Sequence, residues 1–288
     1  MNIFAERRTQ ILNISRYLVL FLVAVVMLYP LLWLVTGIWR SNHEIFTSAG
    51  LIPQNPVSGW QNIVDGWNTR LANNLGFYFL NTLRFLIPRV IGQVISCVLA
   101  AYAIARFRFF GKKLVFILVI ATLLMPDVIF RIPMFILYRD LGMFGTFLPL
   151  WLDNSFAVGS FFVFMLIQFI RTIPRDLDEA ATIDGCGSFQ ILIRILIPVM
   201  MPAVITVALL TFMWGMNDFL GPLIYIRDSN QWVLQQALRQ ASDMSGEGGI
   251  NWGEVFAMSV IALIPAITLF FAAQRFFIEG IASTGSKE

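Results

Sequence analysis

The charged residues that could do chemistry gather in one polar stretch, residues 171–198, which reads RTIPRDLDEAATIDGCGSFQILIRILIP between two apolar runs. Asp176, Asp178 and Glu179 stand near its start. No nucleophile stands beside a base, and the single histidine, His43, has no cysteine or second histidine nearby to share a metal ion. We therefore expect no enzymatic activity and no metal site. The chemistry available to this stretch is electrostatic.

Two short helices must position these carboxylates. Pro174 suits a first helical turn, where its missing N–H costs nothing, and the acidic residues then lie at the positive end of the helix dipole. Gly185 can adopt the left-handed conformation that ends a helix. Ser188 can cap a second helix, which becomes apolar and reaches Pro198 at the start of a membrane span.

This pattern resembles the EAA loop of ABC-importer permease subunits, in which Glu-Ala-Ala is followed by Asp-Gly-Ala and then by Ile-x-Leu-Pro. The matching residues are Glu179, Ala180, Ala181, Asp184, Gly185, Ile195 and Pro198. Cys186 replaces the usual alanine and Ile197 the usual leucine, and both changes keep a small or apolar side chain. The resemblance implies a coupling helix that docks into a groove on a cytosolic ATPase subunit.

The composition indicates an integral membrane protein. Of the 288 residues, 58% are hydrophobic and only 13% are charged, and the mean hydropathy is +0.76. A soluble domain carries about 25% charged residues. The basic residues are scattered at the ends of apolar runs and form no aromatic-interleaved patch, so a nucleic-acid partner is not expected.

Six apolar runs are long enough to span a bilayer, which needs about 20 residues each. We predict an all-α, single transmembrane domain over residues 1–288, with the coupling loop at 171–198 between the fourth and fifth spans. The predicted spans are residues 18–39, 78–105, 114–137, 146–170, 199–226 and 255–277.

The distribution of arginine and lysine predicts the orientation, because cytosolic loops carry an excess of these residues. The side that holds the coupling loop carries Arg7, Arg8, Arg16, Arg106, Arg108, Lys112, Lys113, Arg171, Arg175, Arg194, Arg275 and Lys287. The opposite side carries Arg40, Arg70, Arg139, Arg227 and Arg239. Both termini and the coupling loop are therefore expected in the cytosol.

Polar residues at similar depth on several spans are candidates for a translocation path. Aromatic faces combined with carboxylate, amide and guanidinium groups are typical of sugar binding in wet sites. Asp127 and Arg131 stand one turn apart and could form an ion pair. The candidates for the path are Trp214, Asn217, Asp218, Asp127, Asn154 and Arg89.

Further segments resemble the permease subunits of maltose-type carbohydrate importers, among them AAYAIARFRFFGKK (residues 100–113) and FMWGMNDFLGPLIY (residues 212–225). The resemblance implies a second permease subunit, two ATPase subunits that bind ATP and Mg²⁺, an extracytoplasmic binding protein and a sugar or oligosaccharide cargo. It places the chain in the bacterial cytoplasmic (inner) membrane. The chain has no Walker A pattern and is expected to hold no cofactor of its own.

Two alternatives remain open at this point. The same machine could carry a non-sugar or anionic cargo, because Arg84, Arg89 and Arg131 lie in or near the spans. A proton-coupled secondary transporter with Asp127 or Asp218 as the proton carrier is the other reading. The EAA loop and the absence of a detectable inverted repeat argue against it.

Overall fold

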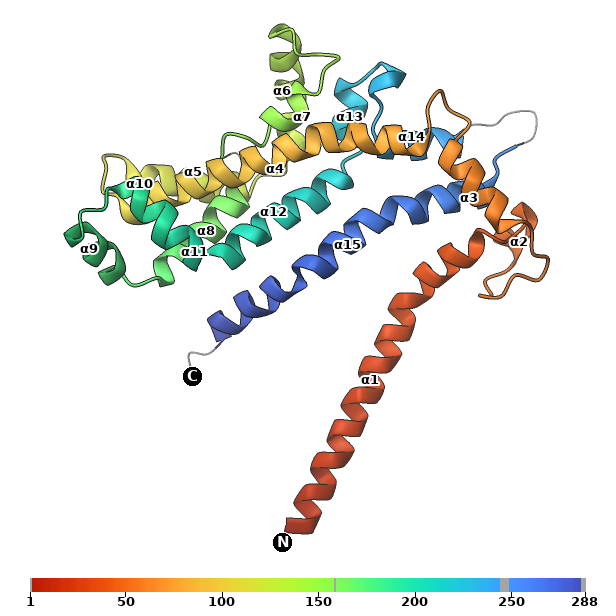
Figure 1. Ribbon diagram of the computed structural model, residues 1–288, viewed down its shortest axis with the longest axis horizontal. Coiled ribbons are helices and arrows are strands. Elements are labelled where there is room, and N and C mark those ends of the chain that lie inside the picture. Colours follow the sequence, from red (N-terminus) through yellow and green to blue (C-terminus); the bar gives the residue numbers. More distant parts are fainter. Residues whose placement is uncertain (1, 158, 244–248, 286–288) are drawn as a thin grey trace. The chain divides into compact units, whose positions relative to one another are not determined.

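The computed structural model describes residues 2–157, 159–243 and 249–285, and the side chains of residues 13–274 within those ranges. Every regular element among the described residues is a helix (Figure 1), which confirms the all-α prediction. Lys287 and the side chains of Arg7, Arg8 and Arg275, which were counted for the orientation, lie outside the described residues. The chain divides into two compact units.

The first unit comprises Met1–Leu75 and Leu238–Ala262. It contains α1 (Asn2–Gly37), α2 (Asn42–Thr47) and α3 (Gly59–Asn68), with the second half of α14 (Leu234–Asp243) and the start of α15 (Trp252–Gly285). Close packing joins α1 to α15, because a side chain at Gly37 would collide with the ring of Phe256. Asn62 on α3 donates a hydrogen bond of 2.6 Å to the carbonyl of Ile38.

The loop after α1 is ordered by two buried charges. The guanidinium of Arg40 donates to the carbonyls of Ser48 and Gly50, and the carboxylate of Glu44 accepts from the backbone N–H groups of Gln54 and Asn55. Arg40 is 1% exposed and Glu44 4%. Because these hydrogen bonds favour the ionised form, with that of Gln54 the strongest, the pKa of Glu44 lies below its ordinary value.

The second unit comprises Gly76–Ala237 and Leu263–Glu288. Its longest helix is α4 (Leu75–Arg106). The following helices are α5 (Lys112–Leu123), α6 (Val128–Asp140), α7 (Leu148–Leu152), α8 (Ser160–Thr172), α9 (Asp176–Ile183), α10 (Ser188–Ile191), the π-helix η1 (Leu192–Leu196), α11 (Ile197–Val199), α12 (Met201–Met216), α13 (Leu220–Tyr225) and the 3-10 helix η2 (Ser229–Gln231).

The core of this unit joins α4, α8 and α12 to the predicted coupling loop. Its buried members include Ala101 and Tyr102 on α4, Leu166 and Ile170 on α8, and Val207 on α12, and it continues through the loop in Ala181, Ile191, Leu192 and Leu196. The loop is therefore packed into the helix bundle at its base. A small-residue contact supports the same bundle, because a side chain larger than hydrogen at Gly92 would collide with Ser155.

The predicted spans appear in different forms. Among the described residues, three helices are long and apolar enough to cross a membrane: Asn13–Gly37, Leu75–Arg106 and Trp252–Gln274. Two bent helix pairs pass the same test if each pair is counted as one span: Lys112–Leu123 with Val128–Asp140 at 106°, and Ser188–Val199 with Met201–Met216 at 80°. The predicted fourth span contains α7 and α8, which are separated by the polar residues Asp153, Asn154 and Ser155. The count of six spans stays a prediction.

Candidate functional site

The acidic stretch folds into α9, as the sequence predicts, but Pro174 precedes the N-cap and does not lie in the first turn. Its first turn carries Asp176, Asp178 and Glu179, and Arg175 stands at the N-cap without a side-chain capping bond. The carboxylates therefore meet the positive end of the helix dipole, which stabilises them by about 0.3–1 kcal/mol each. This local effect explains why a helix of only eight residues persists on the surface.

A glycine turn ends α9 in the predicted manner. Gly185 has a φ angle of +83°, in the left-handed region. The N–H of Cys186 donates to the carbonyl of Ala181 at 2.9 Å, and that of Gly185 to Thr182 at 3.1 Å. These two bonds form a Schellman motif, which satisfies carbonyls that the helix end would otherwise leave open.

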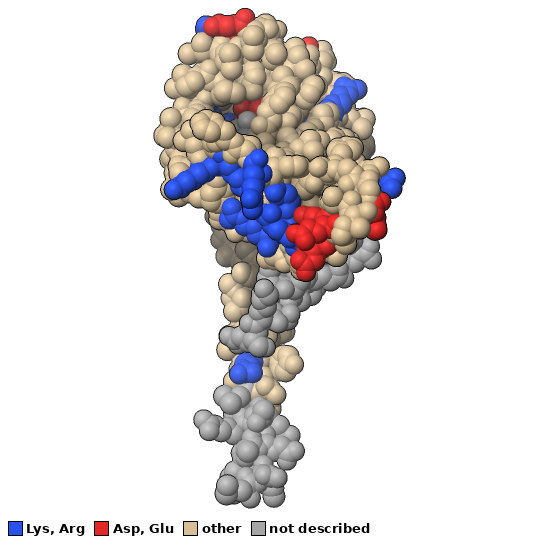
Figure 2. Space-filling model, turned by 90° about the vertical axis from the view of Figure 1, so that its left-hand side faces the viewer, with Lys and Arg blue, Asp and Glu red and all other residues tan. Residues whose placement is uncertain are grey.

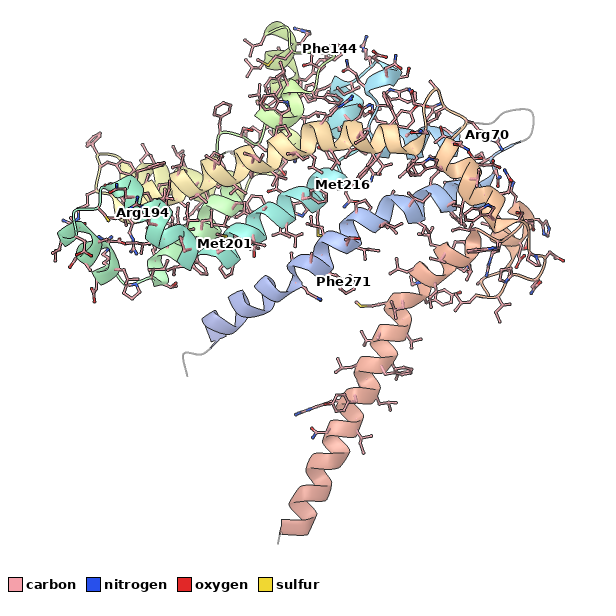
Figure 3. All side chains as sticks on the ribbon, in the orientation of Figure 1. Arg70, Phe144, Arg194, Met201, Met216 and Phe271 are labelled. Atoms are coloured by element: carbon pink, nitrogen blue, oxygen red, sulfur yellow. The ribbon has the colours of Figure 1, made fainter. Side chains whose placement is uncertain are left out.

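The second helix of the loop differs from the prediction in two respects. Its N-cap is Gly187 and not Ser188, and the side chain of Gln190 accepts the hydrogen bond of the Gly187 N–H at 3.0 Å. The helix also contains the π-helical segment η1, whose residue Arg194 is labelled in Figure 3. Met201 and Met216 mark the ends of the next helix, α12. The π turn and the bend before α12 change the direction of the chain, so that it passes from the loop into the bundle.

The C-terminal end of α4 holds this loop in place. Arg106 forms an ion pair with Asp178 at 2.7 Å, and the two side chains are 7% and 20% exposed. The contact joins the Arg106 Nε to the Asp178 Oδ2 and lacks the alignment of a hydrogen bond, since the Nε has no hydrogen-bond partner. Arg106 also donates to the carbonyl of Ile173 at 3.0 Å, and the Tyr102 hydroxyl donates to that of Ser188 at 2.9 Å. Both helices of the loop are thus fastened to one long helix.

The outer surface of the loop is exposed and mixes acidic with apolar residues. Glu179 and Ala180 are exposed, as are the large apolar side chains of Leu177, Ile183 and Phe189, with Ile183 at 87%. Figure 2 shows this end of the second unit, where acidic side chains lie next to a group of basic ones. Such a surface presents what a docking partner needs, namely apolar anchors with charges beside them.

The seven motif residues divide between this surface and the interior. Ala181 is buried and Ile195 is half-buried, so these two pack the loop onto the bundle. The exposed members are Glu179, Ala180, Asp184, Gly185 and Pro198.

A second polar cluster lies where α4 meets the break between α12 and α13. Arg89 forms an ion pair with Asp218 at 3.1 Å, and the two side chains are 13% and 17% exposed. The other oxygen of Asp218 accepts from the N–H of Gly221 at 3.0 Å. The sequence predicted both residues as path candidates but gave no sign that they pair, because 129 positions separate them.

Asp153 on the α7 side joins the same cluster. It lies within reach of the charges of Arg89, Arg131 and Asp218, and it is hydrogen-bonded to Tyr138. Tyr138 was not among the candidates for the translocation path. The apolar context of Tyr138 in α6 gives no signal of a polar role. Of these charged groups, Arg89 and Asp218 form the one ion pair among the described residues.

The other path candidates lie elsewhere in the second unit. Trp214 is half exposed and packs against Phe162 with the ring centroids 5.2 Å apart. The Asn217 side chain donates back to the carbonyl of Met213 at 2.8 Å, where it caps α12. Asn154 is half-buried, and Asp127 is exposed at the start of α6.

The expected ion pair between Asp127 and Arg131 is absent from the described residues. The chain bends between α5 and α6, so Asp127 stands at the N-cap rather than inside a continuous helix. The buried Nε of Arg131 has no hydrogen-bond partner among the described residues.

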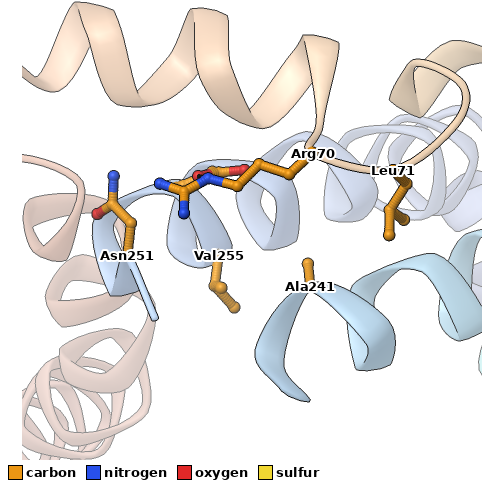
Figure 4. Close-up of a pocket in the computed structure, with 6 residues that line it drawn as sticks. Arg70, Leu71, Ala241, Asn251 and Val255 are labelled. Atoms are coloured by element: carbon orange, nitrogen blue, oxygen red, sulfur yellow. Dashed lines mark ion pairs between the residues drawn. The ribbon is translucent and has the colours of Figure 1, made fainter. Parts of the chain in front are cut away.

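The first unit holds a small surface hollow that is lined in part by an ion pair (Figure 4). Arg70 reaches Glu254 at 3.2 Å, and Leu71, Ala241, Asn251 and Val255 complete the lining. The pair fastens the loop after α3 to α15. Within the described residues, no three metal-ligating side chains come together.

Residues 93–283 match the family described as "Binding-protein-dependent transport system inner membrane component". The chain belongs to this family. The probable ABC transporter permease protein YurM of Bacillus subtilis is 29% identical over 284 residues, which cover 98% of this chain and 91% of the relative. The diacetylchitobiose uptake system permease protein NgcG of Streptomyces coelicolor is 30% identical, with 93% and 86% covered.

A solved structure shows the same fold. A chain of a bacterial ABC transporter involved in the import of the acidic polysaccharide alginate superposes with a TM-score of 0.79. The alignment covers 93% of this chain and 97% of that one, at 21% identity. The fold is therefore that of a type I ABC-importer permease.

As a binding-protein-dependent permease, the chain is the membrane component of an ATP-driven importer and not its ATPase. Membership in the family implies a partner permease, ATPase subunits and a binding protein. It also makes the chain a multi-pass protein of the inner membrane.

Proposed function

We propose that this permease pairs with a second permease to form the translocation path for a sugar or oligosaccharide, and that the loop at residues 171–198 couples the path to two cytosolic ATPase subunits. The observation that carries the proposal is an exposed acidic helix whose base is fastened to α4. Glu179 faces solvent, while Asp178 beside it is held by Arg106. One helix thus offers a docking surface on one side and a rigid connection on the other.

The mechanism follows from that connection. Closure of the ATPase subunits moves α9, and the Arg106–Asp178 pair and the buried Ala181 pass the movement to the bundle. Packed helices are bistable and not continuously deformable, so a displaced loop shifts the bundle between inward-open and outward-open arrangements. A loose loop would absorb the motion instead.

The proposed orientation has the coupling loop and both termini in the cytosol. The excess of arginine and lysine at the loop's side of the bundle supports it. ATP and Mg²⁺ are bound by the ATPase subunits, and this chain needs no cofactor. The binding protein delivers the cargo from the opposite side.

The proposed cargo is a neutral sugar. The relative NgcG is named for uptake of diacetylchitobiose, and this supports a saccharide. In the polar cluster, Arg89 and Asp218 neutralise each other, so Arg89 offers no free positive charge to an anion. Trp214, Asn217, Asn154 and Asp127 are further candidates for contacts along the path. An anionic cargo is the second candidate, favoured by the likeness to an alginate importer chain.

The test is uptake of a panel of labelled sugars by vesicles that contain the complete importer and its binding protein. We expect Glu179→Ala and Gly185→Val to abolish ATP-driven uptake while both variants still reach the membrane. Asp176→Ala is the matched control, because it removes another exposed acidic residue from the same helical turn. Unimpaired uptake by both loop variants, or uptake driven by a proton gradient without ATPase subunits, would contradict the proposal.

A further inference from the structure

The segment between α4 and α5 combines exposed cations with exposed aromatic rings. Residues 107–113 read FRFFGKK, and Arg108, Lys113 and Phe109 are exposed, while Phe110 is fully exposed at 105%. We call Arg108, Lys112 and Lys113 the loop cations. Basic side chains gather at the end of the second unit that Figure 2 shows.

The loop cations lack counter-charges. Among the described residues, none of the three forms an ion pair, whereas nearby Arg106 is neutralised by Asp178. Lys112 donates to the carbonyl of Phe107 at 2.9 Å, and the charges of Arg108, Arg171 and Arg175 act on it repulsively. Like charges held this close favour an anion between them.

The helix that follows adds to the positive potential. Lys112 and Lys113 are the first two residues of α5, and no acidic residue stands in its first turn. Both ammonium groups thus lie at the positive end of the dipole, where cations are unfavourable. The local arrangement costs stability unless an anion is present.

The flank of α5 indicates what kind of anion this is. No side chain of α5 is buried, and Leu114, Ile117 and Leu118 are exposed at 61%, 49% and 54%. An apolar helix flank that begins at a cluster of cations matches a bilayer, with acyl chains along the flank and headgroups at its end. Phe109 and Phe110 belong at that interface.

We propose that the loop cations, with Arg171 and Arg175, form a binding site for the phosphate-bearing headgroup of an anionic phospholipid. Arg171 is already oriented by its contact with the ring of Phe116, 4.8 Å from the centroid. The site is next to α9 but separate from its acidic docking surface, and it does not depend on which cargo is carried. Basic residues near an anionic membrane surface contribute about 1 kcal/mol each, which corresponds to about fivefold in affinity.

The experiment compares lipid selectivity in the assembled importer. The complex is reconstituted in phosphatidylcholine nanodiscs that contain either spin-labelled phosphatidylglycerol or spin-labelled phosphatidylcholine, and the motionally restricted fraction of the label is measured. The test variant is Arg108→Gln/Lys112→Gln/Lys113→Gln. The matched control, Arg139→Gln/Arg227→Gln/Arg239→Gln, removes the same charge from exposed positions on other segments. A third variant, Arg108→Lys/Lys112→Arg/Lys113→Arg, keeps the charge.

We expect the unmodified and charge-keeping complexes to retain more phosphatidylglycerol than phosphatidylcholine. The test variant should lose this preference by up to about fivefold per charge, and the control should keep it. Equal retention of the two lipids by the unmodified complex would overturn the proposal. So would an unchanged preference in the test variant together with lost ATPase binding, because the cations would then meet an acidic protein surface. Failure of the Glu179 variants described above would leave this result unaffected.

Discussion

The coupling loop and the Arg89–Asp218 cluster both belong to the second unit, but they differ in how far their charged side chains are paired and buried. In the cluster, Arg89 and Asp218 form an ion pair, and both side chains are less than one-fifth exposed. In the loop, only Asp178 is paired, while Asp176, Glu179 and Asp184 face solvent beside apolar residues.

We infer from this difference that the paired charges stabilise the bundle and that the exposed charges are available to bind a partner protein. A buried charge without a partner costs several kcal/mol, so the cluster must be balanced from within. An exposed charge costs little in the free chain and gains its full value only when a partner covers it. The predictions below test this distinction, beginning with the largest expected effect.

Removal of one partner from the cluster should cost the most stability. Arg89→Ala leaves Asp218 buried without its counter-charge, which lowers the free energy of unfolding by about 3–5 kcal/mol. Denaturation of the purified chain in detergent measures this loss. The double variant Arg89→Leu/Asp218→Leu should recover much of it, because neither charge remains. If the losses of the two single variants simply add in the double variant, the charges are not coupled.

Loss of the Arg106–Asp178 ion pair at the base of the loop should lower both the stability of the chain and its transport activity. Arg106→Met removes the partner of Asp178 and the bond to Ile173, and we expect a loss of about 2–3 kcal/mol in stability together with lower ATP-driven uptake. Arg139→Met is the control, because Arg139 is exposed and its ion pair with the neighbouring Asp140 is exposed as well. Similar losses in both variants would show that the pair has no special role.

The glycine turn permits a finer comparison between two neighbouring positions. Gly185→Ala should lower stability by about 1–2 kcal/mol, because an alanine side chain strains a backbone at φ +83°. Gly187→Ala is the control: its φ is −73°, and a Cβ meets no atom within 4 Å at either position. The contrast isolates backbone strain from steric collision. Equal stability of the two variants in thermal unfolding would rule out the strained turn.

The smallest effect concerns a buried charge in the first unit. The pKa of Glu44 lies below its ordinary value of 4.5, so its contribution to stability is complete above that value. As the pH falls below about 4.5, the unfolded chain takes up a proton first, and the contribution is lost as the pH passes through the folded pKa. Unfolding between pH 6 and pH 3 should therefore be less steep with pH in Glu44→Gln than in the unmodified chain. An identical pH dependence would show that the bonds to Gln54 and Asn55 do not stabilise the loop.

Local patterns predicted the coupling loop well because its structure is decided by neighbours in the sequence. The acidic first turn, the left-handed Gly185 and the second helix all follow from interactions within a few residues. The N-cap was misplaced by one position: Gly187 and not Ser188 is the N-cap, and the Gly187 N–H donates to the side chain of Gln190. Both residues suit the role, and only the backbone geometry distinguishes them.

The polar cluster was predicted in its members but not in its pairing. Asp127 and Arg131 have the spacing of a helical ion pair, yet the bend between α5 and α6 places Asp127 at a helix start. Arg89 and Asp218 form an ion pair although 129 positions separate them. Tyr138 interacts with Asp153 from a third segment of the chain. No periodicity or spacing reports such contacts.

By itself, the sequence determined the membrane character, the helical class and the acidic loop, because hydropathy, dipole and turn chemistry act over short distances along the chain. Only the tertiary structure decided which charges are neutralised inside the second unit and which remain on its surface. The physical reason is that charge compensation depends on distance in space, and packing sets that distance independently of separation along the chain.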